Sequence, residues 1–221
     1  MNKKHFLPLV ACILAASSCN LDDQFSVSNM NDLVTVYSQT LLINDYNTSY
    51  TITEDQSDHQ WAVGDRLVIL FDILNRDYDI SLRDYVKCIV STPTPVPEDQ
   101  EPSLGEDPVM VNTCTISGGY VNMELVYYVK TGSSFPHRIA MEYQDDGYAL
   151  NLFLIHEGNG ENPATTDKGS LTTVVAPYSF SLDGLAPSGE SRKLNLTLNT
   201  LSDSNGIEQK SYSLYEGSIS F

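Results

Sequence analysis

Three histidines, at positions 59, 137 and 156, are the side chains of this sequence best suited to acid–base or metal chemistry. His59 lies in a polar stretch, His137 at the expected start of a strand and His156 at the expected end of another. None has the HExxH or paired spacing of zinc ligands, so we expect neither a metal nor a cofactor. A GxSxG motif is also absent, and 29 acidic residues make a chance carboxylate pair too common to indicate a glycosidase. The sequence therefore favours a protein without catalysis, with a surface hydrolase acting on glycan or peptide as the alternative.

A cysteine near the N-terminus is expected to undergo lipid attachment. Residues 1–18 have a basic start, an apolar run and small residues at the end, as in a secretory signal peptide. The apolar run is shorter than the about 20 residues that cross a bilayer. Ala16, Ser17 and Ser18 followed by Cys19 are similar to the bacterial lipobox, in which the cysteine is acylated and becomes the first residue. We therefore predict a lipid on Cys19, with plain secretion as the alternative.

The residues that follow Cys19 bear on where the protein is exported. Asp22 and Asp23 resemble the export signal that sends lipoproteins of Bacteroides-like bacteria to the outer face of the outer membrane. The alternative is that residues 19–24 are a solvated tether whose acidity has no such role. The sequence therefore predicts an outer-membrane lipoprotein and leaves open whether it faces the periplasm or the cell surface.

Two further cysteines, Cys88 and Cys114, lie in the part of the chain that would be exported to an oxidising compartment. A bridge between them would close a loop whose restriction stabilises a protein by roughly 3 kcal/mol. The alternative is that each is a small core residue, because Cys88 shares a strand face with Val86 and Val90. The sequence favours the core positions over the disulfide.

The charge of the chain restricts its partners. The 221 residues have a formal net charge of −17, and loss of Lys3 and Lys4 with the signal peptide would make it −19. A strongly acidic protein is not expected to bind nucleic acid or anionic lipid head groups, but it suits a cationic partner. With 41% hydrophobic residues, the chain can build a core of its own.

Residues 25–92 have the pattern of a small all-β barrel. The apolar and β-branched runs at residues 34–43 and 46–53 indicate a hairpin, and residues 67–74 (LVILFDIL) indicate a central strand. Residues 78–90 continue in an extended pattern. Four or five short strands in this space predict an OB-like or SH3-like barrel, although the basic groove of a nucleic-acid-binding OB-fold is absent.

A proline-rich acidic stretch separates this block from the next. Residues 93–108 hold five of the ten prolines and five acids without a base, a composition that predicts a stiff linker. Residues 109–221 then alternate apolar and polar residues in about seven strands, which predicts a β-sandwich. Its clearest hairpin signal is Asp145-Asp146-Gly147. Its longest expected loop is residues 158–169, and such loops often carry binding function.

Tyrosines gather in the second block and could form a contact surface for a sugar or a protein. Strand alternation predicts that Tyr127 and Tyr148 point inward. This leaves Tyr128 as the candidate surface contact, although sheet packing would explain the same residues.

The order of several short motifs resembles the NigD-like lipoproteins of Bacteroides and Prevotella relatives. The resemblance covers nearly the whole chain after the signal and rests on VGDRLVILFDIL, SLGEDPV, ISGGYVNMEL, FPHRIAMEY, LNLFLIHEGNGE and YSFSLDGL in that order. It implies an OB-like domain followed by a β-sandwich that starts near SLGEDPV, on a lipoprotein named for a bacteriocin-associated operon and without established activity. The sequence departs from the family pattern before the GGY turn and at Ile155-His156-Glu157.

Together these patterns predict a lipid-anchored envelope protein whose two β-domains bind a protein or a glycan. They leave the identity of that partner, the bacteriocin link and the oligomeric state open.

Overall fold

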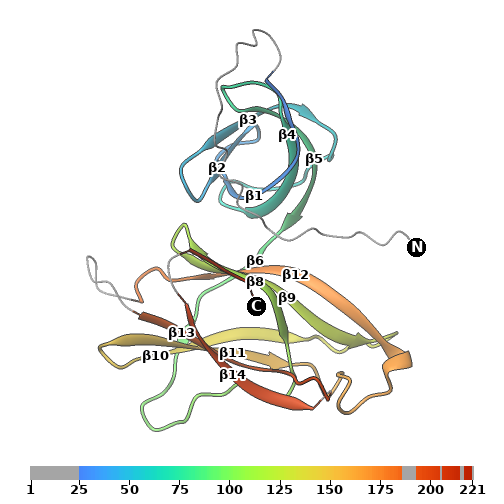
Figure 1. The fold of residues 1–221 in the computed structure, drawn as a ribbon, viewed down its shortest axis with the longest axis vertical. Helices are drawn as coiled ribbons and strands as arrows, with labels where there is room; N and C mark the ends of the chain where they lie inside the picture. Colours follow the sequence, from blue (N-terminus) through green and yellow to red (C-terminus); the bar gives the residue numbers. More distant parts are fainter. Residues whose placement is uncertain (1–24, 186–192, 205, 215–216, 221) are drawn as a thin grey trace. The chain divides into compact units, whose positions relative to one another are not determined.

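The computed structural model describes residues 25–185, 193–204, 206–214 and 217–220. The expected signal peptide, Cys19, Asp22 and Asp23 lie outside these residues. Within them, every regular element except one short 3-10 helix is a β-strand, so the all-β prediction is confirmed (Figure 1). None of the described segments is a helix with the length and apolar character needed to cross a membrane. The chain divides into two units, Met1–Cys88 and Ile89–Phe221, and each is described by itself.

The first unit is a closed barrel of five strands. These are β1 (Val27–Val36), β2 (Leu41–Asn44), β3 (Ser49–Asp55), β4 (Arg66–Ile73) and β5 (Asp79–Lys87). They close in the order β1-β2-β3-β5-β4, and each neighbouring pair is antiparallel except β3 and β5, which are parallel. The predicted small N-terminal barrel is therefore confirmed (Figure 1).

Strand β4 supplies much of the barrel interior. Leu67, Ile69 and Phe71 are buried and alternate with half-buried residues, as expected of a strand that lines a small barrel. Trp61, the only tryptophan of the chain, joins the same core with its ring edge-on to Tyr85 at 5.0 Å between centroids. Trp61 is therefore a spectroscopic reporter for the barrel unit.

The sequence predicts one strand over residues 34–43. In the structure this run is divided between the end of β1 and most of β2. The Ser38 hydroxyl accepts hydrogen bonds from the backbone N–H groups of Thr40, at 3.3 Å, and Leu41, at 3.1 Å. This side-chain-to-backbone turn interrupts the strand. β1 and β2 therefore pair with each other, and a second turn at residues 45–48 leads into β3.

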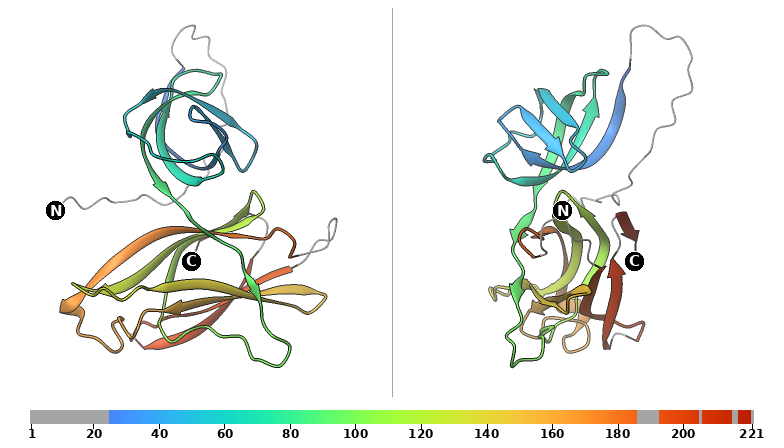
Figure 2. Two further views of the ribbon diagram at one scale, coloured as in Figure 1. Left: turned by 180° about the vertical axis from the view of Figure 1, so that it is seen from behind. Right: turned by 90° about the vertical axis from the view of Figure 1, so that its left-hand side faces the viewer.

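The second unit is a sandwich of two five-stranded sheets, as predicted (Figure 2). One sheet has the order β14-β13-β11-β10-β7 and the other has the order β15-β8-β9-β12-β6. The strands are β6 (Ile89–Ser91), β7 (Thr94–Pro95), β8 (Met110–Ser117), β9 (Tyr120–Lys130), β10 (Arg138–Asp145), β11 (Ala149–Glu157), β12 (Leu171–Ser181), β13 (Lys193–Leu201), β14 (Ile207–Leu214) and β15 (Gly217–Ser220), with the 3-10 helix η1 (Lys168–Ser170) before β12.

Alternating apolar side chains from both sheets fill the sandwich. The predicted inward row of β11, Leu150, Leu152 and Leu154, is buried in one core cluster with Val121 and Leu125 of β9. The expected hairpin at Asp145-Asp146-Gly147 joins β10 to β11. Burial of one face of each sheet thus fixes the register of the strands.

The boundary between the units differs from the prediction. Residues 89–92 were assigned to the barrel, but β6 pairs in parallel with β12 of the sandwich. Residues 93–108 were expected to be a linker, but β7 pairs in parallel with β10. The backbone N–H of His156 also bonds Leu104 O at 3.2 Å. A proline-rich chain can follow the edge of a sheet because its carbonyls remain available as acceptors, so this segment is part of the sandwich unit.

Tyr148 corrects the expectation that it points inward. It is 88% exposed, because it lies in the turn before β11 begins at Ala149, where strand alternation does not apply. Tyr127 is half-buried against the sandwich core, and Tyr128 is half-buried as well.

Candidate functional site

Two loops and one connecting segment meet at one end of the sandwich. In one sheet Lys130 at the end of β9 pairs with Leu171 at the start of β12, and in the other Arg138 at the start of β10 pairs with Glu157 at the end of β11. Residues 131–137 and 158–170 therefore connect the two sheets at the same end. The segment that leads into β8 reaches this place through its hydrogen bonds to His156.

Asp107 organises the longer loop. Its side chain is buried, with 2% of the residue exposed, and its Oδ2 accepts hydrogen bonds from the backbone N–H of Gly158 at 2.7 Å and Gly160 at 3.1 Å. Its Oδ1 accepts a third from Asn162 Nδ2 at 2.6 Å. A buried carboxylate with several donors holds a loop in one conformation, because its loss would leave those donors without partners.

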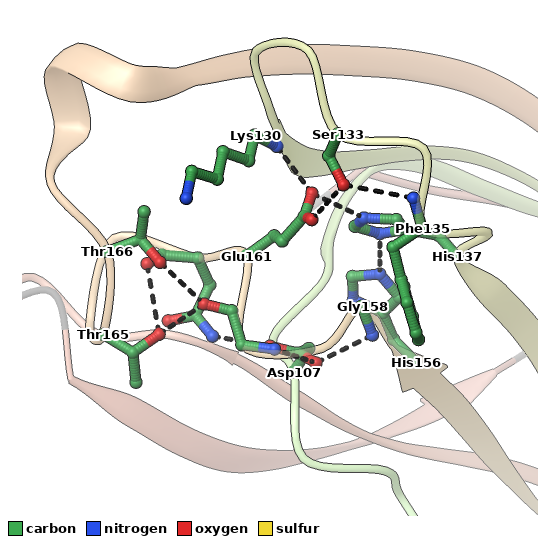
Figure 3. Close-up of polar contacts among 12 residues, drawn as sticks. Asp107, Lys130, Ser133, Phe135, His137, His156, Gly158, Glu161, Thr165 and Thr166 are labelled. Carbon is green, nitrogen blue, oxygen red and sulfur yellow. Dashed lines mark hydrogen bonds and ion pairs between the residues drawn. The ribbon is translucent and has the colours of Figure 1, made fainter.

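The two histidines form a chain with a glutamate (Figure 3). His156 Nδ1 lies 3.0 Å from the backbone oxygen of Pro108, and its Nε2 lies 3.0 Å from His137 Nδ1. His137 Nε2 in turn lies 3.2 Å from Glu161 Oε2. The exposed fraction is 1% for His156 and 7% for the side chains of His137 and Glu161, so these three hydrogen-bonded side chains are largely withdrawn from solvent.

The protons available to this row of hydrogen-bonded groups, from Pro108 to Glu161, can be counted. The carbonyl at one end and an ionised carboxylate at the other only accept, so three hydrogen bonds need three protons. Two neutral imidazoles carry two, and one of the three contacts then lacks a hydrogen. Burial lowers the pKa of His156, which favours the neutral form of its ring.

Close backbone packing around the histidines requires two glycines. A Cβ on Gly158 would lie 2.7 Å from the His137 ring, and one on Gly105 would lie 2.2 Å from the backbone oxygen of His156. Gly105 also has a φ of +71°, which other residues adopt at a cost. Only glycine fits at these positions without displacing the histidines.

Glu161 connects this buried chain to a cavity of about 390 Å³. Glu161 Oε2 accepts a hydrogen bond from the backbone N–H of Lys130 at 2.6 Å, and Oε1 accepts one from the Ser133 hydroxyl. The Lys130 N–H, followed by the Ser133 hydroxyl, holds the pKa of Glu161 below its usual value, so this carboxyl is ionised at neutral pH. We call this cavity the Glu161 pocket; it is lined by Lys130, Thr131, Gly132, Ser133, Asn159, Glu161 and Thr166.

The arrangement limits the chemistry of the site. Among the described residues, no group of three or more His, Cys, Asp or Glu side chains could hold a metal ion. Ser133 donates to Glu161 and accepts the backbone N–H of Phe135 at 3.1 Å, so a carboxylate, not a histidine, lies beside its hydroxyl. The site offers a fixed, ionised hydrogen-bond acceptor at the wall of a polar pocket.

The structure places the other candidate residues elsewhere. Tyr128 lies on β9 opposite Thr173, within the sheet. Cys88 and Cys114 are thiols, and Cys114 lies in the sandwich core, where burial raises its thiol pKa to about 12. His59 belongs to the barrel, where its ring stacks on Trp61 at 3.8 Å between centroids.

Sequence reasoning considered His137 and His156 separately and did not bring them together. It placed Asp107 in a linker and did not select Glu161 or Ser133. The only local signal for the site was the polar loop at residues 158–169, which was expected to carry function and does contribute Asn159 and Glu161.

Comparison with known proteins gives the family of the chain. Residues 92–215 match the model of the NigD-like C-terminal beta sandwich domain. No curated protein matches the chain.

Solved structures share the fold at low sequence identity. A protein of unknown function from Bacteroides vulgatus is 21% identical, with a TM-score of 0.64 over 86% of this chain and 90% of that one. A NigD-like immunity protein from Bacteroides caccae is 20% identical, with a TM-score of 0.62 over 85% of this chain and 98% of that one. A candidate lipoprotein from Bacteroides fragilis is 15% identical, with a TM-score of 0.54 over 87% and 97%. Since the family model covers more than half of the residues, the chain belongs to the NigD-like family.

Proposed function

We propose that this NigD-like protein is a lipid-anchored protein of the cell envelope that binds a protein or glycan partner without catalysis. The observation that carries the proposal is the Glu161 pocket, in which a carboxylate is fixed by Lys130 N–H, Ser133 and His137 before any ligand arrives. A polar group that is already held in place binds without the entropic cost of ordering it.

The lipid anchor is part of the proposal. The motif that ends in Cys19 supports acylation, and a solved structure with the same fold belongs to a candidate lipoprotein. More than one acyl chain is needed for stable anchoring, since each buried CH₂ contributes about 0.8 kcal/mol. We place the protein in the outer membrane, and Asp22 and Asp23 support export to its outer face.

Radiolabelled palmitate tests the anchor in the full-length protein. The unchanged protein should incorporate label and fractionate with the outer membrane, whereas Cys19→Ala should lose both properties. Protease added to intact cells should degrade the protein if it faces outward. Equal labelling of Cys19→Ala would refute the anchor.

We assign the barrel to the OB type, supported by its closed order β1-β2-β3-β5-β4 with a parallel β3–β5 pair. We do not expect it to bind nucleic acid. Three of the four basic side chains in the described part of the barrel, Arg66, Arg83 and Lys87, form ion pairs with barrel carboxylates, so most of the positive charge that would contact phosphates is neutralised.

The competing function is a surface hydrolase, and one observation favours it: the Ser133 hydroxyl and the Glu161 carboxylate are in contact at the pocket wall. Against it, the rings of His137 and His156 are buried behind Glu161, out of reach of a substrate in the pocket. A general base must reach the proton that it removes. Hydrolysis of a glycan or peptide that is lost in Ser133→Ala and retained in Ser38→Ala, a barrel control, would establish the hydrolase.

A pull-down tests binding. Immobilised residues 20–221, which retain both described units, should recover a saturable partner from envelope extracts of the native organism. Recovery of the partner should fall when the pocket variant Asn159→Gly is immobilised in place of the wild-type protein. Repeated failure at high protein concentration, or recovery that is equal for the variant, would refute a partner at this site.

A more specific version is a bacteriocin-linked accessory or immunity role, which is supported by the family and by the fold shared with a NigD-like immunity protein. Deletion of the gene should raise sensitivity to the cognate toxin. Unchanged sensitivity would eliminate this version and leave the binding proposal standing.

A further inference from the structure

We infer that the Glu161 pocket takes a neutral carbohydrate, bound through its hydroxyl groups. The inference rests on the proposed binding function and names the ligand class of the same site. It follows from which hydrogen-bonding groups, charges and apolar surfaces the pocket offers.

The pocket supplies an acceptor. Glu161 is ionised, and its two oxygens accept from Lys130 N–H, Ser133 and His137. Two carboxylate oxygens offer about four lone-pair sites, so three donors leave about one for a ligand. The O–H group of a ligand can donate a hydrogen bond to that remaining lone pair of Glu161.

The pocket also supplies donors. The Lys130 side chain runs from its backbone nitrogen toward Thr166 in Figure 3, and its ammonium makes no hydrogen bond or ion pair within the described part of the chain. Asn159 lines the same pocket with an exposed side-chain amide that both donates and accepts. A sugar has several hydroxyl groups that each donate and accept, so different hydroxyl groups of one sugar can bind the Glu161 carboxylate, the Lys130 ammonium and the Asn159 amide.

The charges of the pocket favour a neutral ligand. Glu161 and Lys130 are its only ionisable lining residues, and they have opposite charges. An anionic ligand would meet Glu161, and a cationic one would meet Lys130. A ligand without net charge can use both groups without repulsion.

The remaining ligand classes fit poorly. The lining contains no aliphatic or aromatic side chain, so a lipid or an aromatic compound would find no apolar wall. The described residues contain no metal-binding group of three ligands, which argues against cation chelation.

Calorimetric titration of residues 20–221 tests the inference. The probes are short glucan, mannan, galactan and chitin oligosaccharides, an anionic polygalacturonate oligosaccharide and an oligolysine peptide. At least one neutral probe should bind saturably and more tightly than both charged probes. Saturable binding of none of the neutral probes, or a preference for a charged one, would overturn the inference.

Two pocket variants localise the binding. Lys130→Met keeps the aliphatic stem and removes the ammonium, and Asn159→Gly removes the amide at a residue whose φ is +57°, where glycine is unstrained. Lys130→Met should weaken the neutral probe by about tenfold or more, as expected for a lost hydrogen bond to a charged group, and Asn159→Gly by roughly two- to tenfold, as expected for a neutral one.

Lys193→Met, a lysine at the start of β13 outside the pocket, is the matched control and should bind like the unchanged chain. Thermal unfolding monitored by circular dichroism should be alike for Lys130→Met, Asn159→Gly and Lys193→Met. Equal affinities for all three would overturn the inference. Recovery of a protein partner in the pull-down without sugar binding would refute the sugar and retain the proposed function.

Discussion

His137 and His156, 19 residues apart in the chain, place Nδ1 of one ring 3.0 Å from Nε2 of the other. Tyr127 contacts both rings, at 5.5 Å and 5.3 Å between centroids, and Glu161 and Pro108 end the chain of contacts. The pair is therefore a junction that links the loop with Glu161 to the segment with Pro108. Its protonation and its packing both bear on the pocket.

The first prediction concerns pH. The pKa of His156 is lowered chiefly by burial, and that of Glu161 chiefly by the backbone N–H of Lys130. For both groups the unfolded chain binds a proton at a higher pH than the folded one, so acidification favours unfolding. We expect the free energy of unfolding to be greatest above the usual histidine value of 6.5, and to fall below it and again below the usual glutamate value of 4.5.

Guanidinium unfolding followed by circular dichroism over a pH series measures this dependence. Glu161→Gln should make the fall at the lower pH values smaller, with Asp55 and Asp65, whose pKa values are also lowered, accounting for part of what remains. Glu101→Gln, at an exposed position, should leave the fall unchanged. Stability that rises on acidification from pH 7 would contradict the sign derived from these shifts.

The fold was largely predictable because most of its signals are local. Alternation along β11 and the turn at Asp145–Gly147 depend on neighbouring residues, and the structure confirms them. β8 has no clear signal in the sequence because Asn112, Thr113 and Thr115 interrupt its apolar pattern, although its pairing with β9 makes it a strand. The start of β12 is equally hard to predict because Thr172 and Thr173 interrupt its apolar pattern, yet both residues pair with β9.

The site was not predictable in the same way, because its contacts are distant in the chain. Asp107 lies 51 residues from Gly158 and 55 from Asn162. Composition alone predicted that the segment around Asp107 is an acidic linker, because a sequence does not show which carboxylate is buried. Only the folded backbone brings this residue beside the loop.

Asp107 should be the most important carboxylate of the sandwich for stability. Asp107→Ala removes the acceptor of three donors in a buried place, for which we expect a loss of about 3 kcal/mol. Asp99→Ala, an exposed acid of the same segment, is the control and should cost less than about 0.5 kcal/mol. Chemical unfolding measures both, and hydrogen exchange at residues 158–162 should accelerate in Asp107→Ala alone. Equal effects of the two variants would contradict the role of Asp107.

The glycines beside the histidines can be compared with one that has open space. Gly119 has a φ of +81°, and a Cβ at this position would have no atom within 4 Å, so Gly119→Ala measures backbone strain alone, roughly 1 kcal/mol. Gly105→Ala adds a collision with the backbone of His156 and should cost at least about 2 kcal/mol more. Gly158→Ala should fall between the two, because a side-chain ring can move. Equal losses of thermal stability in Gly105→Ala and Gly119→Ala would refute the close approach.

The barrel depends on one buried ion pair. Arg66 donates to both oxygens of Asp45, at 2.9 Å and 2.8 Å, and their side chains are 3% and 5% exposed. Asp45→Ala leaves the guanidinium buried without this partner, so we expect a loss of about 3 kcal/mol or more. The exposed pair Lys87–Asp65 gives the control Lys87→Met, with an expected loss below about 1 kcal/mol. Fluorescence of Trp61 follows both transitions, and a small effect of Asp45→Ala would contradict the assignment.

The two cysteines of residues 20–221 should differ in reactivity. Burial raises the thiol pKa of Cys114 to about 12, so its nucleophilic thiolate is scarce at pH 8. Cys88 is only half-buried, and alkylation of the folded protein should modify it first and Cys114 only after unfolding. Cys88→Ser should therefore abolish labelling of the folded protein, and intact mass should be the same with and without reductant. Failure of iodoacetamide to modify either thiol in the unfolded, unreduced protein would instead establish the disulfide that the sequence left as the alternative.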